Sequence, residues 1–87
     1  MNYLYFEWDE GNEYKVRQRA SLEEVESSFY DPKKKILKTY FNRYILYART
    51  NSGRLLFTVY QRKAGGIIRV ISTRDMTRTN KRYYYKK

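Results

Sequence analysis

The chain has 87 residues, of which 19 are Lys or Arg and nine are Asp or Glu, and its formal net charge is +10. It has no cysteine and no histidine, which excludes disulfides, thiolate metal sites, a cysteine nucleophile and the usual base near neutral pH. Its length predicts one domain over residues 1–87 with a thin core, so any active site is expected in a surface groove.

The first 31 residues predict a strand followed by two helices. Residues 3–8 are aromatic and apolar, which is typical of an opening strand. Asp9 is expected to cap a short helix over about residues 10–18. Ser21 and Glu24 have the spacing of a capping box, which predicts the start of a second helix. The apolar stripe of that helix follows helical spacing and comprises Leu22, Val25 and Phe29.

After an expected turn at Asp31-Pro32, β-branched and aromatic residues predict four strands. They are expected near residues 36–41, 44–50, 54–60 and 67–72, with turns at 51–53 and 62–66. The last of these runs is the most apolar and is predicted to be central in the sheet. A final helix is expected to begin near residues 75–77.

This order, β-α-α-β-β-β-β-α, predicts an α+β domain. It has two N-terminal helices, an antiparallel sheet of about four to five strands and one C-terminal helix, with the helices packed against one face.

Charge is segregated along the chain. Residues 1–31 carry eight acidic and three basic side chains, a net of −5, whereas residues 32–87 carry sixteen basic side chains and one acidic one, a net of +15. Such a basic segment attracts phosphate through counterion release, which predicts a polyanionic partner. The alternative is a charged surface that serves solubility alone, but solubility does not require the two signs to be separated.

Nothing in the sequence predicts a membrane or secretory segment. No apolar run approaches the roughly 20 residues that span a bilayer, and the first residues lack the basic and apolar regions of a signal peptide. A cytoplasmic location without a membrane partner is therefore expected.

Several stretches of the chain resemble one known family. Residues 6–16, 22–32, 53–56 and 68–74, and the final helix as far as Tyr84, are similar to BrnT-type toxins, with further matches at Arg43 and Thr50. The Trp8-Asp9 opening and the Arg-Val-Ile-Ser-x-Arg run at residues 69–74 are the most specific parts. The family comprises ribonuclease toxins of bacterial type II toxin–antitoxin systems with a RelE-like fold. The resemblance implies RNA as substrate and a cognate antitoxin as protein partner.

The chain departs from the family in two places. The family usually has a basic-His-Gly step between its first two helices, where this chain has residues 17–20, Arg-Gln-Arg-Ala. The final helix of the family often carries a glutamate where this chain has Asn80. These departures favour an alternative, a non-catalytic nucleic-acid-binding module of the same fold. A third hypothesis is a protein-interaction domain whose basic face docks an acidic partner.

Metal-free cleavage of RNA is the chemistry that these residues can support. The 2′-oxygen attacks the adjacent phosphorus, cationic side chains stabilise the phosphorane, and a base takes the 2′ proton. No cofactor or metal is required. The catalytic candidates are Arg69, Arg74, Lys15 and Tyr84. The further RNA-binding candidates are all basic: Arg19, Arg43, Arg54, Arg78, Lys81 and Arg82.

Structural roles for the same residues remain open. Arg69 can instead pair with Glu7 or Asp9, and Tyr84 can instead fill the thin core. Arg69 and Arg74 are five residues apart, so a regular strand cannot place both on one face unless it ends near Ser72. The basic run at residues 33–35 is expected to be a solvated turn that adds general phosphate affinity.

Overall fold

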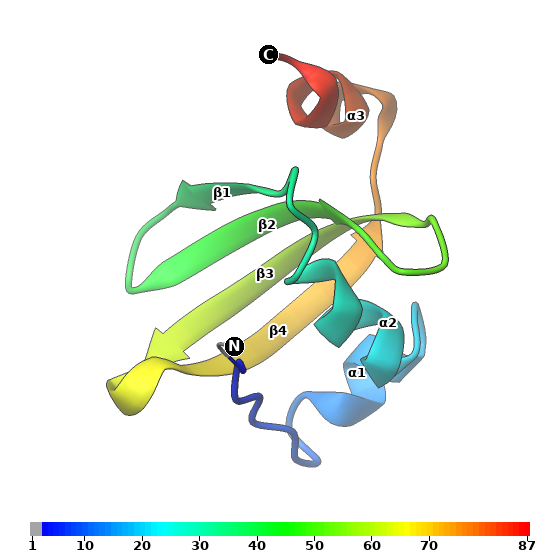
Figure 1. Cartoon of the computed structure of the whole chain (residues 1–87). Coiled ribbons are helices and arrows are strands. Elements are labelled where there is room, and N and C mark those ends of the chain that lie inside the picture. The colour runs from blue at the N-terminus through cyan, green and yellow to red at the C-terminus, as the bar shows by residue number, and fades with distance from the viewer. Residues whose placement is uncertain (1–2) are drawn as a thin grey trace.

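The computed structural model describes residues 3–87 (Figure 1). In this range the chain forms three α-helices, a short 3-10 helix and one four-stranded antiparallel sheet. The elements in chain order are α1 (Glu13–Arg17), α2 (Leu22–Ser28), β1 (Lys35–Lys38), β2 (Arg43–Arg49), β3 (Leu55–Lys63), η1 (Ala64–Gly66), β4 (Ile67–Asp75) and α3 (Arg78–Tyr85). The predicted α+β class is confirmed.

The start of α2 follows the capping signal in the sequence. The Ser21 hydroxyl accepts from the backbone N–H of Glu24 at 3.0 Å, and the Glu24 carboxylate accepts from the N–H of Ser21 at 3.1 Å. This reciprocal pair satisfies two backbone donors that the first turn of a helix leaves without partners.

The start of α1 differs from the prediction. The helix begins after Asn12 and has five residues, so Asp9 is not its N-cap. The Asp9 carboxylate instead accepts from the N–H of Gly11 at 2.8 Å, and its carbonyl accepts from the N–H of Glu13 at 2.8 Å. The residues predicted to form the first turn of the helix therefore form this tight turn before it.

The opening segment forms an isolated bridge rather than the predicted strand. Phe6 bridges Ile68 in parallel orientation, with the N–H of Glu7 and the carbonyl of Tyr5 bonded to Ile68 at 2.8 Å each. The segment runs beside β4 only at this point, because the Asp9 turn then redirects the chain. Its aromatic residues are used for packing, since the Phe6 ring meets the Phe29 ring edge-on at 5.1 Å between centroids.

The strands follow one another across the sheet in the order β1-β2-β3-β4. The prediction that residues 67–72 form a central strand is therefore wrong, because β4 lies at an edge. Successive hairpins place each strand beside its predecessor, so the last strand ends the sheet whatever its composition. Its apolar side chains Ile68 and Val70 are buried all the same, at 5% and 0% exposure, beneath the helices.

The helices pack on both faces of the sheet, not on one. Val16 of α1 and Val25 of α2 belong to a core cluster with the inward side chains of the strands. A second cluster joins Tyr84 of α3 to Met76 and Tyr47, which lies on the other face. Figure 1 shows α3 at one end of the sheet, away from α1 and α2. The sequence pattern identified the apolar residues but not the direction in which the chain leaves β4.

An irregularity divides β4 in two. Its pairing with β3 shifts register between Val59 and Tyr60, and Ile71 of β4 has no partner in the register. An extra residue of this kind is a β-bulge, and it resets the alternation of side chains along the strand.

The bulge places Arg69 and Arg74 on the same face. Arg69 lies opposite Gln61 and Arg74 lies opposite Phe57, and these partners are four residues apart on β3. Side chains an even number of residues apart on a regular strand share a face. The expectation that β4 must end near Ser72 to achieve this is thus wrong, since the strand continues to Asp75.

Candidate nucleic-acid interface

One face of the sheet carries most of the basic strand residues. We call it the open face, because α1 and α2 pack on the opposite side and α3 covers one end of it. Cross-strand pairing assigns to it Lys35, Leu37, Arg43, Ile45, Tyr47, Arg49, Leu55, Phe57, Val59, Gln61, Lys63, Ile67, Arg69, Ser72 and Arg74. The surface thus has an apolar centre with basic side chains around it, an arrangement suited to a polyanion with apolar bases.

Arg74 is held in a fixed position on the open face. Its guanidinium carbon lies 4.0 Å from the centre of the Phe57 ring, in a cation–π contact. Its Nη1 donates to Asn80 Oδ1 at 2.9 Å and to the carbonyl of Asp75 at 3.2 Å. Among residues 3–87 no carboxylate pairs with Arg74, so its charge is oriented but not neutralised.

Arg69 is neutralised by two carboxylates at the edge of the sheet. Its Nη1 lies 2.9 Å from Glu7 Oε1 and 2.8 Å from Asp9 Oδ2, and its Nη2 donates to Asp9 Oδ1 at 3.0 Å. Hydrogen bonds from Arg69 lower the pKa of Asp9, and bonds from Lys63 and then Arg69 lower that of Glu7. The structure thus supports the pairing alternative for Arg69, which ties the opening segment to β4.

The two arginines are also too far apart to share one phosphate. Their partners on β3, Gln61 and Phe57, are separated by four residues, or about 13 Å along a strand. Arg69 is moreover bound to carboxylates beyond the edge of β4. Of the two arginines expected to form the site together, Arg74 alone remains a candidate for binding the phosphate.

Tyr84 lies in the core, and its hydroxyl is bonded to Asp31 and not to Arg74. Its side chain is buried, and its hydroxyl donates to Asp31 Oδ2 at 2.6 Å. Burial and the bond to the Asp31 carboxylate raise the pKa of Tyr84 to about 12. The hydroxyl is thus neither exposed to substrate nor able to serve as a base near neutral pH, which corrects its prediction as a catalytic residue.

The candidates Lys15, Arg19 and Arg54 make no hydrogen bond or ion pair with Arg74. Lys15 is exposed on α1, which covers the opposite face of the sheet. Arg19 is exposed beyond the end of α1, and its carbonyl accepts from Arg54 Nη2 at 2.9 Å. Arg54 also pairs with Glu24 at 3.1 Å and Asp75 at 3.0 Å. Arg54 thus joins the helices to the end of β4, and its charge is largely compensated.

The other basic candidates are exposed around the open face. Arg43 begins β2 and belongs to the open face, whereas Arg78, Lys81 and Arg82 lie on the outer side of α3. These positions suit phosphate contacts that position a strand of nucleic acid without reading its sequence.

Two residues that sequence reasoning did not assign to the site support Arg74. Phe57 supplies the ring beneath the guanidinium, and Asn80 supplies the acceptor beside it. Asn80 was noted as a departure from the family, but its contact with Arg74 depends on the bulge and on the position of α3. No single-sequence pattern gives either feature.

A comparison of the sequence with known protein families and with curated proteins finds no match. Within residues 3–87, no helix has the length and apolar character needed to cross a bilayer.

Proposed function

We propose that this chain is the toxin of a type II toxin–antitoxin system, an endoribonuclease that acts in the cytoplasm on RNA bound to the open face. The α+β order of its elements agrees with the RelE-like fold that the resemblance to BrnT-type toxins implies. The net charge of +10 favours a polyanionic substrate over a neutral one.

The observation that carries the proposal is the state of Arg74. Its guanidinium is oriented by Phe57 and Asn80 and lacks a carboxylate partner in the described chain. Nη1 makes both protein bonds, so Nη2 and Nε remain for the oxygens of a phosphate. A guanidinium presents donors in a planar fork and stays protonated, which suits it to stabilise a phosphorane.

The proposed reaction needs no metal or cofactor. The 2′-oxygen forms a bond to the adjacent phosphorus while the bond from phosphorus to the 5′-oxygen breaks. The products are a 2′,3′-cyclic phosphate and a 5′-hydroxyl, and the departing 5′-oxygen gains a proton. Since Lys15 is on the helix that covers the opposite face and the Tyr84 hydroxyl is buried against Asp31, we assign removal of the 2′ proton to water.

The decisive assay is cleavage of single-stranded RNA in EDTA, with analysis of the new ends. The wild type is expected to yield 2′,3′-cyclic phosphates and to leave a 2′-deoxy analogue intact. Arg74→Ala should lower the cleavage rate about 100-fold, as removal of one oriented donor does elsewhere. Arg62→Ala is the matched control, because this exposed arginine on the other side of β3 changes the net charge equally. Equal rates for wild type and Arg74→Ala would overturn the proposal.

The position of Lys15 on the opposite face and the burial of the Tyr84 hydroxyl against Asp31 favour the second candidate, a non-catalytic nucleic-acid-binding module. This candidate predicts salt-sensitive binding that Arg74→Ala weakens, with no cleavage and no growth arrest when the chain is expressed alone. The toxin proposal predicts growth arrest that the product of the adjacent reading frame, the expected antitoxin, relieves. Arrest without relief would support the nuclease but not the antitoxin partner.

A further inference from the structure

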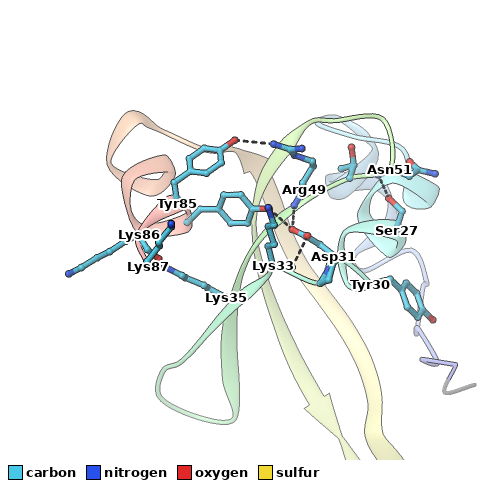
Figure 2. Close-up of a pocket in the computed structure, with 13 residues that line it drawn as sticks. Ser27, Tyr30, Asp31, Lys33, Lys35, Arg49, Asn51, Tyr85, Lys86 and Lys87 are labelled. Carbon is cyan, nitrogen blue, oxygen red and sulfur yellow. Dashed lines mark hydrogen bonds between the residues drawn. The ribbon is translucent and has the colours of Figure 1, made fainter.

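A groove of about 870 Å³ lies beside the C-terminal end of α3, at the end of the open face that this helix covers (Figure 2). Its other wall is the end of α2 with the turn that follows, and the end of β2 contributes its floor. Two of its lining residues, Lys35 and Arg49, belong to the end of the open face that α3 covers, whereas Arg74 and Phe57 do not line the groove. The basic side chains among them are Lys33, Lys35, Arg49, Lys86 and Lys87, and the single acidic one is Asp31.

The Asp31 carboxylate forms hydrogen bonds that connect the elements lining the groove. Its Oδ2 accepts from the Tyr84 hydroxyl and from the N–H of Arg49 at 2.8 Å, and its Oδ1 accepts from the N–H of Lys33 at 2.9 Å. The three donors come from α3, β2 and the turn after α2. The carboxylate therefore fixes the walls and pairs with no basic side chain of the lining.

One lysine of the groove is structural, and the other cations face solvent. Lys35 donates to the carbonyls of Tyr83 and Lys86, which satisfies acceptors at the C-terminal end of α3. The Arg49 guanidinium donates to the Tyr85 hydroxyl at 3.1 Å, and no carboxylate within residues 3–87 pairs with it (Figure 2). The side chains of Lys33, Lys86 and Lys87 are exposed.

Two of the three tyrosines that line the groove, Tyr30 and Tyr85, have exposed rings although their hydroxyls are hydrogen-bonded. The Tyr85 hydroxyl accepts from Arg49, and the Tyr30 hydroxyl accepts from the N–H of Leu4 at 2.9 Å. The residues nevertheless remain 56% and 50% exposed, respectively. A ring that is held at its hydroxyl and open at its surface is a platform on which an unpaired base can stack.

We propose that this groove binds a second segment of the same single-stranded RNA, away from the phosphate that reacts at Arg74. The inference rests on the proposed function, because it takes RNA as the ligand. The cations supply phosphate contacts, and the exposed rings favour RNA over an acidic peptide, which needs no stacking surface. The helix α3 links the two sites, since Asn80 near its start contacts Arg74 and Tyr85 at its end lines the groove.

The groove is tested with Lys33→Ala combined with Arg49→Ala, against the control Lys38→Ala combined with Arg62→Ala. The control residues are exposed, lie outside both sites and remove the same charge. Binding is measured with oligouridylates of about 16 and about 4 nucleotides. These lengths are the upper and lower limits of the site sizes of single-strand-binding folds. The groove variant should bind the longer RNA about tenfold more weakly than the control, with a log–log salt dependence shallower by about 1.4 for two lost phosphate contacts.

A second variant, Tyr85→Leu, removes the ring without changing the charge. It should also weaken binding of the longer RNA about tenfold, while the salt dependence stays that of the wild type. Thermal unfolding of each variant checks that the fold persists.

The outcomes separate this inference from the proposed function. If Arg74→Ala abolishes cleavage while the groove variant binds RNA as the control does, the nuclease proposal holds and the groove inference is overturned. If no cleavage occurs but the groove variant and Tyr85→Leu both weaken RNA binding, the groove inference stands and the nuclease proposal fails. Loss of binding to polyglutamate with unchanged RNA affinity would assign the groove to an acidic peptide and overturn the inference.

Discussion

Arg74 donates to Asn80 Oδ1 across 2.9 Å, and the same oxygen accepts from the N–H of Thr77 at 3.0 Å to cap α3. One amide oxygen thus orients the guanidinium and also accepts from a backbone donor at the N-terminal end of α3. Because the amide carries no charge, Arg74 keeps its full charge toward the open face.

Asn80→Asp is expected to stabilise the fold and to weaken RNA binding. The carboxylate keeps both acceptor roles, adds a favourable charge near the N-terminal end of α3 and pairs with Arg74. The free energy of unfolding should rise by about 0.5–1 kcal/mol, and RNA affinity should fall about fivefold, as a loss of ~1 kcal/mol requires. Urea unfolding and RNA titration at low salt measure the two effects. Unchanged affinity in a stabilised variant would count against a phosphate contact at Arg74.

Tyr84→Phe is expected to destabilise the protein without slowing cleavage by the folded molecules. It removes the 2.6 Å bond to Asp31 and leaves a buried ring of similar shape. Loss of a hydrogen bond to a charged group costs about 1–3 kcal/mol. Denaturant unfolding measures this loss, and the cleavage rate is compared under conditions where both proteins are folded. A slower reaction with unchanged stability would instead show that Tyr84 contributes to catalysis.

Local signals in the sequence were sufficient for some elements. Ser21 and Glu24 identified the start of α2, and the Asn51-Ser52-Gly53 turn separates β2 from β3 as expected. Gly53 has φ of +92°, a conformation that favours glycine. Such features depend on residues close together in the chain, so a single sequence contains them.

The position of the candidate site depends on features that no local pattern specifies. The β-bulge at Ile71 aligns the faces of β4, and the docking of α3 brings Asn80 to Arg74. Asn12 is a further example, since its buried side chain donates to the carbonyl of Val70 at 2.9 Å. These contacts join residues that are distant in sequence. Such long-range contacts determine that Arg69 is neutralised and that Arg74 remains available to a phosphate.

Arg69→Ala is expected to loosen the opening segment rather than to abolish RNA binding. It leaves Glu7 and Asp9 close together without the shared cation between them. The free energy of unfolding should fall by about 1–2 kcal/mol, within the range for partly exposed networks and charged hydrogen bonds. Hydrogen exchange at the Glu7 amide, which donates to the carbonyl of Ile68, should accelerate.

Lys63→Ala provides a matched control for Arg69→Ala. It also removes a partner of Glu7 but leaves the contacts between Arg69 and Asp9 intact. A smaller change in exchange at Glu7 is therefore expected. A large loss of RNA affinity in Arg69→Ala, with exchange unchanged, would instead assign Arg69 to the RNA site.

Acid is expected to destabilise the fold through Asp31. Burial alone would raise the pKa of this carboxyl, but hydrogen bonds from Tyr84 and from the N–H groups of Arg49 and Lys33 lower it below the usual 3.8. The unfolded chain therefore binds a proton at higher pH than the folded one. The stabilisation is complete above the unfolded pKa and is lost as pH falls through the folded one.

Urea unfolding at a series of pH values from neutral to below 3.8 measures this dependence. In the wild type, the free energy of unfolding should decline steadily over the acidic part of the series. Asp31→Asn should be less stable at neutral pH and should show a shallower decline, because the titrating group is absent. Glu7, Asp9 and Glu24, whose pKa values are also lowered, contribute to the decline that remains. An equally steep decline in Asp31→Asn would show that Asp31 does not couple folding to pH.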